Sequence, residues 1–409
     1  MKNPFFLNFI LIMSGVCLVS VLLWEAVARV RHWKLILVTV LAVTIVAALG
    51  LQQYSLHFPY LAILAQARSY ELAAMLPLVW FLAFWLAFPC LLLVAAAALI
   101  RHFLPRHKKK AANGQGLTRR DFLKRLALII PGAAFLTSGW GNFNGDHELD
   151  TTYHVYAYKD LPDYLHGYKI GQLSDLHMGL FFSPRRLQQA IDAAAGQGVN
   201  RLEITGDVID ELSLLPQAEK IIRDNAPRFP DGIDFCYGNH EYYRGLPQIT
   251  AMLKKAGVRI LRNAAFAASS GYGQGLAGCQ GRDNRPFYIA GADFSFASGK
   301  DAFKAQREKY VQKALAEVPE NAFVILLAHH PDFFDEAAER GVPLTLSGHT
   351  HGAQFAPIGP IVQKIGFKYL RGPYQKGSCR LYVNRGTGHW LPFRVGCSRE
   401  VSIFELRKG

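Results

Sequence analysis

The stretch "YKIGQLSDLHMG", residues 168–179, joins a short apolar run to a polar ending that contains Asp175 and His177. The apolar run is typical of a buried β-strand. Residues separated by one position point to the same side of an extended chain. We therefore expect a carboxylate and an imidazole to lie together directly after a strand.

Four later runs end in the same way. From about residue 168 onward, short apolar runs alternate with amphipathic segments, which is typical of a layered α/β domain. In open α/β sheets, sites form outside the carboxyl ends of the strands, so we expect these endings to share one edge. The runs are "RLEITGDVID" (201–210) with Asp207 and Asp210, "IDFCYGNHE" (233–241) with Asn239, His240 and Glu241, "FVILLAHHPD" (323–332) with His329 and His330, and "PLTLSGHTHG" (343–352) with His349 and His351.

The chemistry of these endings indicates metal binding. A single His beside a strand is more often a hydrogen-bonded structural residue, but carboxylates gathered this closely repel one another unless cations hold them. A mixture of carboxylate, imidazole and amide oxygen suits Mn, Fe or Zn. The lack of thiolate in this set argues against a closed structural zinc site.

The blocks "SDLHMG", "GDVID", "GNHE", "AHHPD" and "SGHTHG", in this order, resemble those of the calcineurin-like metallophosphoesterase superfamily, DxH, GDxxD, GNH[DE], H and GHxH. The ending "NRGTGHWLPFRVGCSREVSIFEL" (384–406) is similar to that of a bacterial branch often made with a membrane anchor or a twin-arginine signal. The resemblance covers about residues 150–409. It implies a metallophosphoesterase domain over 146–409 with a four-layer αββα sandwich of the α/β class, acting as a phosphoric ester hydrolase.

The resemblance also implies a site for two divalent metal ions, with Mn, Fe and Zn as candidates. The implied ligands are Asp175, His177, Asp207 and His351 for one ion, and Asp207, Asn239, His329 and His349 for the other. Asp207 would bridge the ions, and a hydroxide shared between them would attack a phosphodiester or phosphomonoester. His240 would be the catalytic residue that protonates the leaving oxygen or stabilises phosphoryl charge. Asp210 and Glu241 would orient neighbouring groups.

A few positions leave a choice or depart from the family pattern. His329 and His330 are neighbours that point to opposite faces of an extended chain, and the family pattern favours His329 because its ligand directly follows the strand. Ala353 stands where the family often has a second Gly. His389 and Trp390 replace smaller residues, either neutrally or because they line the substrate pocket.

The first part of the chain predicts a membrane region. The chain is 51% hydrophobic, and residues 5–23, 35–51 and 72–100 are almost free of charge and long enough to cross a bilayer as helices. Residues 1–140 carry 14 of the 45 Lys and Arg but only 3 of the 31 acidic residues, so they hold most of the net charge of +14. This excess is a membrane topology signal, and we expect no binding to nucleic acid.

Two loops are basic: one between the first two apolar runs, with Arg29, Arg31 and Lys34, and one after the third run, with the Lys and Arg residues from Arg101 to Arg125. The positive-inside rule places both basic loops in the cytoplasm and the amino terminus outside. Residues 1–110 would hold three transmembrane helices and a basic loop, and residues 111–145 a fourth segment that begins with "LTRRDFLKRL" (117–126), similar to a twin-arginine export signal. The apolar stretch 126–140 has a Pro and two Gly and is marginal as a span. If it crosses, the protein is a multi-pass protein of a bacterial inner membrane with a periplasmic catalytic domain.

Two alternatives remain open. A domain that stays inside could be a cytoplasm-facing pyrophosphatase acting on a nucleotide-linked lipid precursor, and a non-enzyme could use the fold as a membrane sensor or scaffold. The expected partner is a phosphoester substrate, derived from lipid or the cell envelope, and the sequence does not predict an oligomeric state. We expect a loop at 268–284. The cysteines outside the apolar runs permit disulfides but equally suit free thiols, and they are Cys236, Cys279, Cys379 and Cys397.

Overall fold

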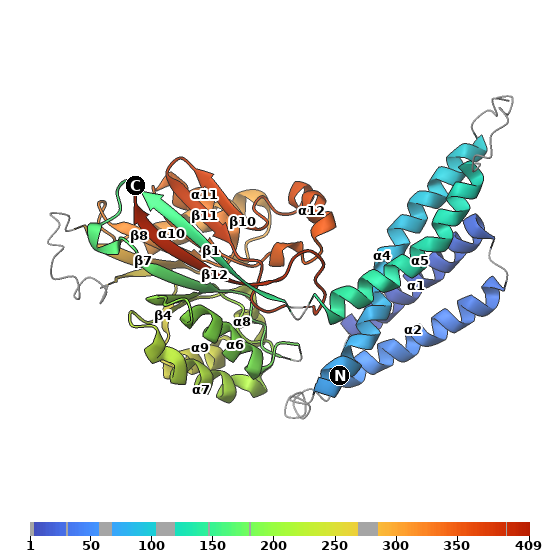
Figure 1. Ribbon diagram of the computed structural model, residues 1–409, viewed down its shortest axis with the longest axis horizontal. Helices are drawn as coiled ribbons and strands as arrows, with labels where there is room; N and C mark the ends of the chain where they lie inside the picture. Colours follow the sequence, from blue (N-terminus) through green and yellow to red (C-terminus); the bar gives the residue numbers. More distant parts are fainter. Residues whose placement is uncertain are drawn as a thin grey trace. The chain divides into compact units, whose positions relative to one another are not determined.

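The computed structural model describes residues 4–29, 32–56, 68–103, 119–145, 148–179, 181–268, 285–389 and 391–409. The chain forms two compact units, Met1–Asn144 and Gly145–Gly409. The first unit is helical and the second is built from two sheets with helices (Figure 1). Except for residue 268, the loop expected at 268–284 lies outside the described residues. Cys279 lies within this part.

The helical unit contains α1 (Pro4–Ala28), α2 (Trp33–Leu56), α4 (Arg68–Phe103) and α5 (Arg119–Phe143). Polar side chains link these helices in an otherwise apolar bundle. Trp80 of α4 donates its Nε1–H to Thr44 Oγ1 of α2 at 3.0 Å, and Ser138 of α5 donates to the Val79 carbonyl of α4 at 2.8 Å. The Trp80 indole and the Ser138 hydroxyl therefore each have a partner inside the bundle, which low-dielectric surroundings favour.

Among the described helices, two are long and apolar enough to cross a membrane, Leu78–Ile100 and Asp121–Phe143, with 23 residues each. Ile12–Ala28 and Trp33–Ala47 are shorter apolar helices. Large apolar side chains point outward, such as Leu93 at 71% and Leu136 at 77% exposure. The sequence stretch 126–140 was too short an estimate of the last segment, because Pro131 lies within a continuous α5 of 25 residues.

The described part of the second unit holds two six-stranded sheets, ordered β1-β12-β2-β3-β4-β5 and β10-β11-β9-β8-β7-β6. The strands are β1 (Leu149–Tyr158), β2 (Lys169–Leu173), β3 (Arg201–Ile204), β4 (Ile233–Cys236), β5 (Arg259–Leu261), β6 (Ala264–Ala267), β7 (Phe287–Ala292), β8 (Phe323–Ala328), β9 (Leu344–Ser347), β10 (Gly372–Lys376), β11 (Cys379–Val383) and β12 (Arg399–Lys408). In the first sheet, β2, β3 and β4 are parallel neighbours, as are β7, β8 and β9 in the second.

Strand β8 shows how the layers arise. Phe323, Ile325 and Leu327 join the core between the sheets, together with residues of β2 and β12. The alternate residues, such as Val324 and Leu326, pack with α10 (Lys300–Ala314) and α11 (Phe334–Glu339). A strand buried on both faces needs an apolar layer on each side, which its continuous apolar sequence provides.

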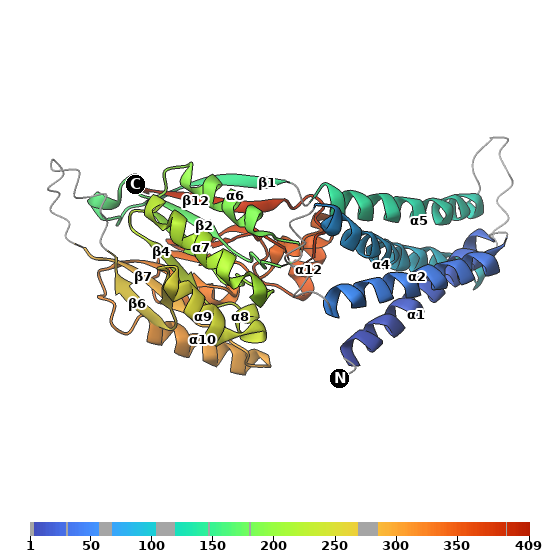
Figure 2. The ribbon, with the colours of Figure 1, turned by 90° about the horizontal axis from the view of Figure 1, so that it is seen from below.

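Helices α6 (Pro184–Ala195), α7 (Leu215–Asn225) and α9 (Leu246–Lys255) lie on the side of the first sheet and contact one another or its strands (Figure 2). The order of layers is therefore helices, sheet, sheet, helices. The predicted four-layer αββα sandwich is confirmed. Shorter helices α8 (Asn239–Arg244) and α12 (Gly359–Ile365) lie in loops that follow strands. Cys236, Cys379 and Cys397 are buried free thiols.

Candidate metal centre

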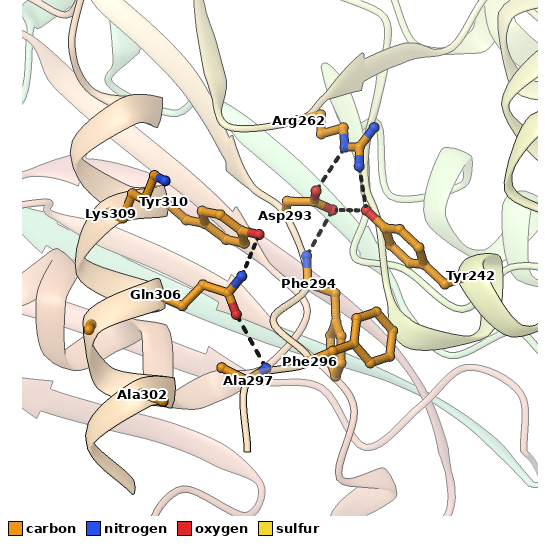
Figure 3. Close-up of a pocket in the computed structure, with 11 residues that line it drawn as sticks. Tyr242, Arg262, Asp293, Phe294, Phe296, Ala297, Ala302, Gln306, Lys309 and Tyr310 are labelled. Atoms are coloured by element: carbon orange, nitrogen blue, oxygen red, sulfur yellow. Dashed lines mark hydrogen bonds and ion pairs between the residues drawn. The ribbon is translucent and has the colours of Figure 1, made fainter. Parts of the chain in front are cut away.

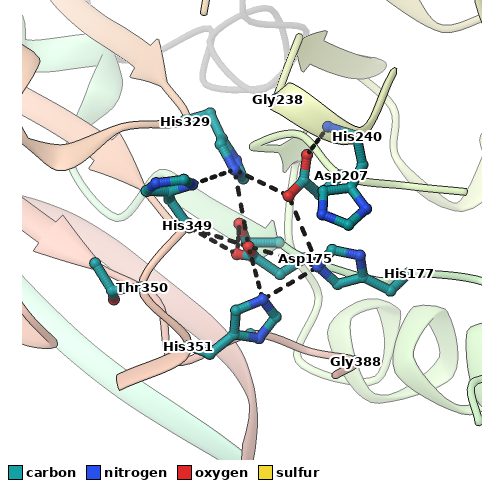
Figure 4. A network of polar contacts seen from close by, with 12 residues as sticks. Asp175, His177, Asp207, Gly238, His240, His329, His349, Thr350, His351 and Gly388 are labelled. Carbon is teal, nitrogen blue, oxygen red and sulfur yellow. Dashed lines mark hydrogen bonds and ion pairs between the residues drawn. The ribbon is translucent and has the colours of Figure 1, made fainter. Parts of the chain in front are cut away.

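The five predicted endings follow strands of both sheets. Loops after β2, β3 and β4 carry residues of the first sheet, and loops after β8 and β9 carry residues of the second. The two sets meet because the backbone N–H of His349 donates to Asp175 Oδ1 at 3.0 Å. Figure 4 shows the resulting cluster of imidazoles and carboxylates.

The backbone of this cluster is left-handed at many of the predicted ligands. Asp175, His177, Asp207, His349 and His351 have φ between 48° and 71°. Such values are uncommon for residues other than Gly and cost about 1–3 kcal/mol each, and they cluster at functional sites. The expectation of an extended chain at the paired positions was wrong. Tight turns, and not the alternation of side chains along an extended strand, determine the directions of these side chains.

One group of ligand atoms contains Asp175, His177 and His351. The Nε2 atoms of the two histidines are 3.1 Å apart, and Asp175 Oδ1 lies 3.4 Å from His351 Nε2 and 4.0 Å from His177 Nε2. Asp175 is fully buried, and Ser174 donates to its other oxygen at 2.6 Å. The group therefore presents two imidazole nitrogens and one carboxylate oxygen to a common point.

A second group contains Asp207, His329 and His349. His329 Nε2 lies 3.1 Å from Asp207 Oδ2 and 3.2 Å from His349 Nδ1. The other ring nitrogen of His329 contacts the Thr205 carbonyl at 2.6 Å, which fixes the orientation of the ring.

Asp207 lies between the groups. Its Oδ2 atom, 3.1 Å from His329 of the second group, is 3.7 Å from Nε2 of His177 in the first. Its Oδ1 atom accepts the backbone N–H of His240 at 2.8 Å. A single carboxylate therefore faces both groups, as the predicted bridging ligand requires.

Asn239 adjoins this carboxylate at the start of α8. Its Oδ1 atom is enclosed and accepts no hydrogen bond within the described structure. A buried amide oxygen without a partner costs free energy unless a donor or cation satisfies it. The next residue, His240, donates its backbone N–H to Asp207, so Asn239 lies beside the cluster, and metal binding by its oxygen stays a prediction.

Glu241 ties the loop after β3 to α8. It is fully buried and accepts three backbone N–H groups, from Gly238 at 2.8 Å, Asp207 at 3.0 Å and Val208 at 2.7 Å. This carboxylate is saturated with donors, which agrees with an orienting part rather than with metal binding.

Asp210 contacts two histidines. Its Oδ1 atom lies 2.5 Å from His240 Nδ1, and its Oδ2 atom lies 3.3 Å from His177 Nδ1. Burial alone would raise the pKa of Asp210, but the bonds to His177 and His240 hold that pKa far below its usual range. Asp210 therefore stays ionised and orients both rings.

The charges in the cluster are interdependent. Burial alone would lower the pKa of His329, but Asp207 and Asp175 raise it to about 10. Burial alone would raise the pKa of Asp207, and His329 and His177 instead hold it well below its usual range. The buried carboxylates thus need positive charge beside them, which divalent ions also supply.

His329 and His330 point to different surroundings. His330 begins the turn Pro331–Phe333 and its Nδ1 accepts the N–H of Asp332 at 3.2 Å. Burial and the charge of His329 lower the pKa of His330 to about 3. The structure brings His329, and not His330, to Asp207.

Three other residues depart from the family pattern, and the structure describes two of them, Ala353 and His389. Ala353 has φ of 64°, a conformation that Gly adopts without strain. His389 is 2% exposed, with its ring centroid 6.3 Å from that of Phe181. Trp390 lies outside the described residues. A contact of His389 with substrate stays a prediction.

The donor set fits a pair of divalent ions. The ligand atoms within each group lie within 4.8 Å of one another, a spacing that one ion with bonds of about 2.0–2.2 Å can span. All seven predicted ligands lie in or beside this cluster, with nitrogen and oxygen donors that suit Mn, Fe or Zn. The orphaned oxygen of Asn239 adds an independent sign of fit.

A sixth strand ending, which was not predicted, also lies near the ligands. In "FYIAGADFS" (287–295), β7 is followed by Asp293 and Phe294. Strand β7 is the parallel neighbour of β8, with Ala292 opposite Ala328, so Phe294 lies near the ligands. Its ring centroid is 5.5 Å from that of His349. The Asp after an apolar run was the available signal.

Comparison with known proteins agrees with this site. The pattern of the calcineurin-like phosphoesterase family matches residues 168–353. The metallophosphoesterase YkuE of Bacillus subtilis (strain 168) is 30% identical over 303 residues, which are 71% of this chain and 98% of that protein. The phosphodiesterase YaeI of Escherichia coli (strain K12) is 27% identical over 308 residues, 71% of this chain and 99% of that protein.

A Danio rerio transmembrane protein with a metallophosphoesterase domain is 27% identical over 265 residues, 61% of this chain and 55% of that protein. With the two long apolar helices, it indicates that this chain associates with a membrane.

The fold and the clustered donors define a metal-dependent phosphoric ester hydrolase. The chain belongs to the calcineurin-like phosphoesterase family. The predicted resemblance to this superfamily is confirmed.

Proposed function

We propose that the chain is a membrane-anchored, dinuclear metallophosphoesterase that hydrolyses a phosphodiester or phosphomonoester derived from lipid or the cell envelope. The observation that carries this proposal is the Asp207 carboxylate, which belongs to one group of imidazole and carboxylate donors and also faces His177 of the other. Asp207 would be shared by both ions. Asp175, His177 and His351 would complete the ligands of one ion, and Asn239, His329 and His349 those of the other. When bound, such ions neutralise phosphoryl charge and activate water.

The residues of the chain supply orientation and a proton. Asp210 holds Nδ1 of His240 and leaves the other ring nitrogen for the substrate. His240 is placed in neither of the two ligand sets, so it can protonate the leaving oxygen at Nε2. A diester is supported by YaeI, a relative named as a phosphodiesterase.

For location, we propose a multi-pass protein of a bacterial inner membrane with its catalytic unit on the periplasmic side. Support comes from the basic loops and from α5, whose apolar part of 23 residues is long enough to span a bilayer. Arg119 and Arg120 begin this helix, where a twin-arginine signal would precede its apolar region. A cytoplasmic pyrophosphatase is the outcome expected if α5 does not cross.

The proposed activity can be tested on the full-length protein purified in detergent. After removal of metal with a chelator, we expect the protein to hydrolyse bis-p-nitrophenyl phosphate only when Mn is restored. Fe and Zn are added to separate samples of the metal-free protein and tested in the same assay. Lack of hydrolysis with all three metals would contradict the proposed function.

A further inference from the structure

A cavity of about 560 Å³ is lined by residues of α8, of α10 and of the loop after β7 (Figure 3). Its size is within the range of pockets for small organic ligands. Much of its lining is aromatic, and these residues are Tyr242, Phe294, Phe296 and Tyr310.

The cavity and the candidate metal centre share walls. Phe294 lines the cavity, and its ring centroid lies 5.5 Å from that of His349 and 5.9 Å from that of His329. On another side, Tyr243 of α8 lies between the cavity and His240, with its ring centroid 5.7 Å from that of Phe296 and 5.8 Å from that of His240. A group bound in the cavity would therefore lie next to both the ligands and the proposed acid.

The aromatic walls are held in place by hydrogen bonds. Tyr242 donates its hydroxyl to Asp293 Oδ1 at 2.6 Å, and Arg262 donates Nε–H to Asp293 Oδ2 at 2.7 Å. Phe296 packs against Tyr242 with ring centroids 5.2 Å apart. Because these side chains are already held in place, they lose less conformational entropy when a ligand binds.

The opposite wall is fixed in a similar way. Gln306 of α10 donates to the Tyr310 hydroxyl at 2.7 Å and accepts from the Ser295 hydroxyl at 2.5 Å. The loop that carries Phe296 is thus tied to α10.

The charge of the lining is weakly positive. Arg262 and Asp293 neutralise one another in an ion pair of 2.7 Å. Lys309 also lines the cavity and pairs with no carboxylate among the described residues. The aromatic walls suit a flat, apolar group better than a short alkyl group, and the positive charge suits attachment of that group to an anionic phosphate.

We propose that this cavity binds an aromatic ester group of the substrate, so that the enzyme selects phosphodiesters with an aromatic substituent. This inference rests on the proposed function, because the aromatic group would be held while the phosphate lies at the metal centre.

Two diesters with one common leaving group test the inference. Full-length, Mn-loaded enzyme in detergent is assayed with O-phenyl S-ethyl phosphorothiolate and with O-methyl S-ethyl phosphorothiolate, in wild type and in Phe296→Ala. The common leaving group, ethanethiol, is not aromatic, and its release is measured with a thiol reagent. Phe296 is 48% exposed, so its truncation leaves the core intact. Val155→Ala, at a residue of 47% exposure in β1, is the matched control.

We expect Phe296→Ala to raise KM for the phenyl ester by on the order of tenfold, and to change KM for the methyl ester by less than about twofold. The ratio of KM for the phenyl ester to KM for the methyl ester is compared between variants, so differences in the intrinsic reactivity of the two esters cancel. Val155→Ala should keep the wild-type ratio.

An unchanged ratio in Phe296→Ala, with both esters hydrolysed, would overturn the pocket assignment and leave the proposed function intact. Hydrolysis of neither ester by Mn-loaded wild type would overturn the proposed function and this inference with it.

Discussion

The Oδ1 atom of Asp210 lies 2.5 Å from the Nδ1 atom of His240. Asp210 is ionised, so it keeps the proton of His240 on Nδ1 or stabilises the doubly protonated ring. The same carboxylate contacts Nδ1 of His177 at 3.3 Å. One residue therefore orients a predicted ligand and the predicted catalytic histidine.

Asp210→Asn should lower kcat by about 10–100-fold at saturating Mn, because both rings lose an ionised partner. Steady-state hydrolysis of bis-p-nitrophenyl phosphate measures this loss. Asp224→Asn removes a surface carboxylate that pairs only with exposed cations, and it should leave kcat unchanged. Equal kcat in Asp210→Asn and wild type would show that Asp210 does not orient His240.

Gly348→Ala should weaken metal binding at least about tenfold. A Cβ at this position would lie 1.9 Å from Ser174 Oγ and 2.2 Å from Asp175 Oδ2, so Asp175 must move. Titration of chelator-treated protein with Mn measures the affinity. In Gly196→Ala the nearest atom is 3.1 Å away, and wild-type affinity is expected. Tight Mn binding by Gly348→Ala would exclude Asp175 as a necessary ligand.

Ala353→Gly should stabilise the second unit by about 0.5–1 kcal/mol. The left-handed conformation at φ of 64° costs Ala roughly 1–2 kcal/mol, and the greater freedom of unfolded Gly cancels about half of this. Thermal unfolding followed by circular dichroism measures the shift. Ala193→Gly, inside α6, should instead destabilise by about 1 kcal/mol. A lower midpoint for Ala353→Gly would contradict the strain at this residue.

Replacement of Arg119 and Arg120 by Lys should keep the catalytic unit inside the cell, if these residues serve as an export signal. Alkaline phosphatase fused after residue 409 should be active with the wild-type sequence and inactive with the double variant. Green fluorescent protein at the same position is the complementary reporter. Unaltered export would leave the two arginines as topology anchors only.

Much of the fold could be predicted, because the types of residue and their order along the chain indicate both the strands and the polar endings that follow them. The blocks from Asp175 to His351 give the donor types, and the apolar runs before them give the strands. The sequence could not give the pairing of β1 with β12, whose partners Leu149 and Arg399 are distant in the chain.

Parts of the site also escaped prediction. The left-handed turns at Asp175 and His177 depend on close tertiary contacts, since His177 donates its backbone N–H to the Asp207 carbonyl at 2.9 Å. The aromatic cavity escaped because Phe294 and Tyr242 resemble ordinary core residues in sequence. Whether the seven predicted ligands bind metal stays a prediction.

The most direct test of the dinuclear centre compares metal content and activity in two variants of the full-length protein, with the surface variant His166→Ala as control. We predict that His240→Ala retains two ions per chain and loses about 10²–10⁴-fold in kcat, because only proton transfer is removed. Asp207→Ala should lose both metal and activity, because both donor groups share that carboxylate. Equal metal content in His240→Ala and Asp207→Ala would contradict the assignment of Asp207 as the bridge and of His240 as the acid.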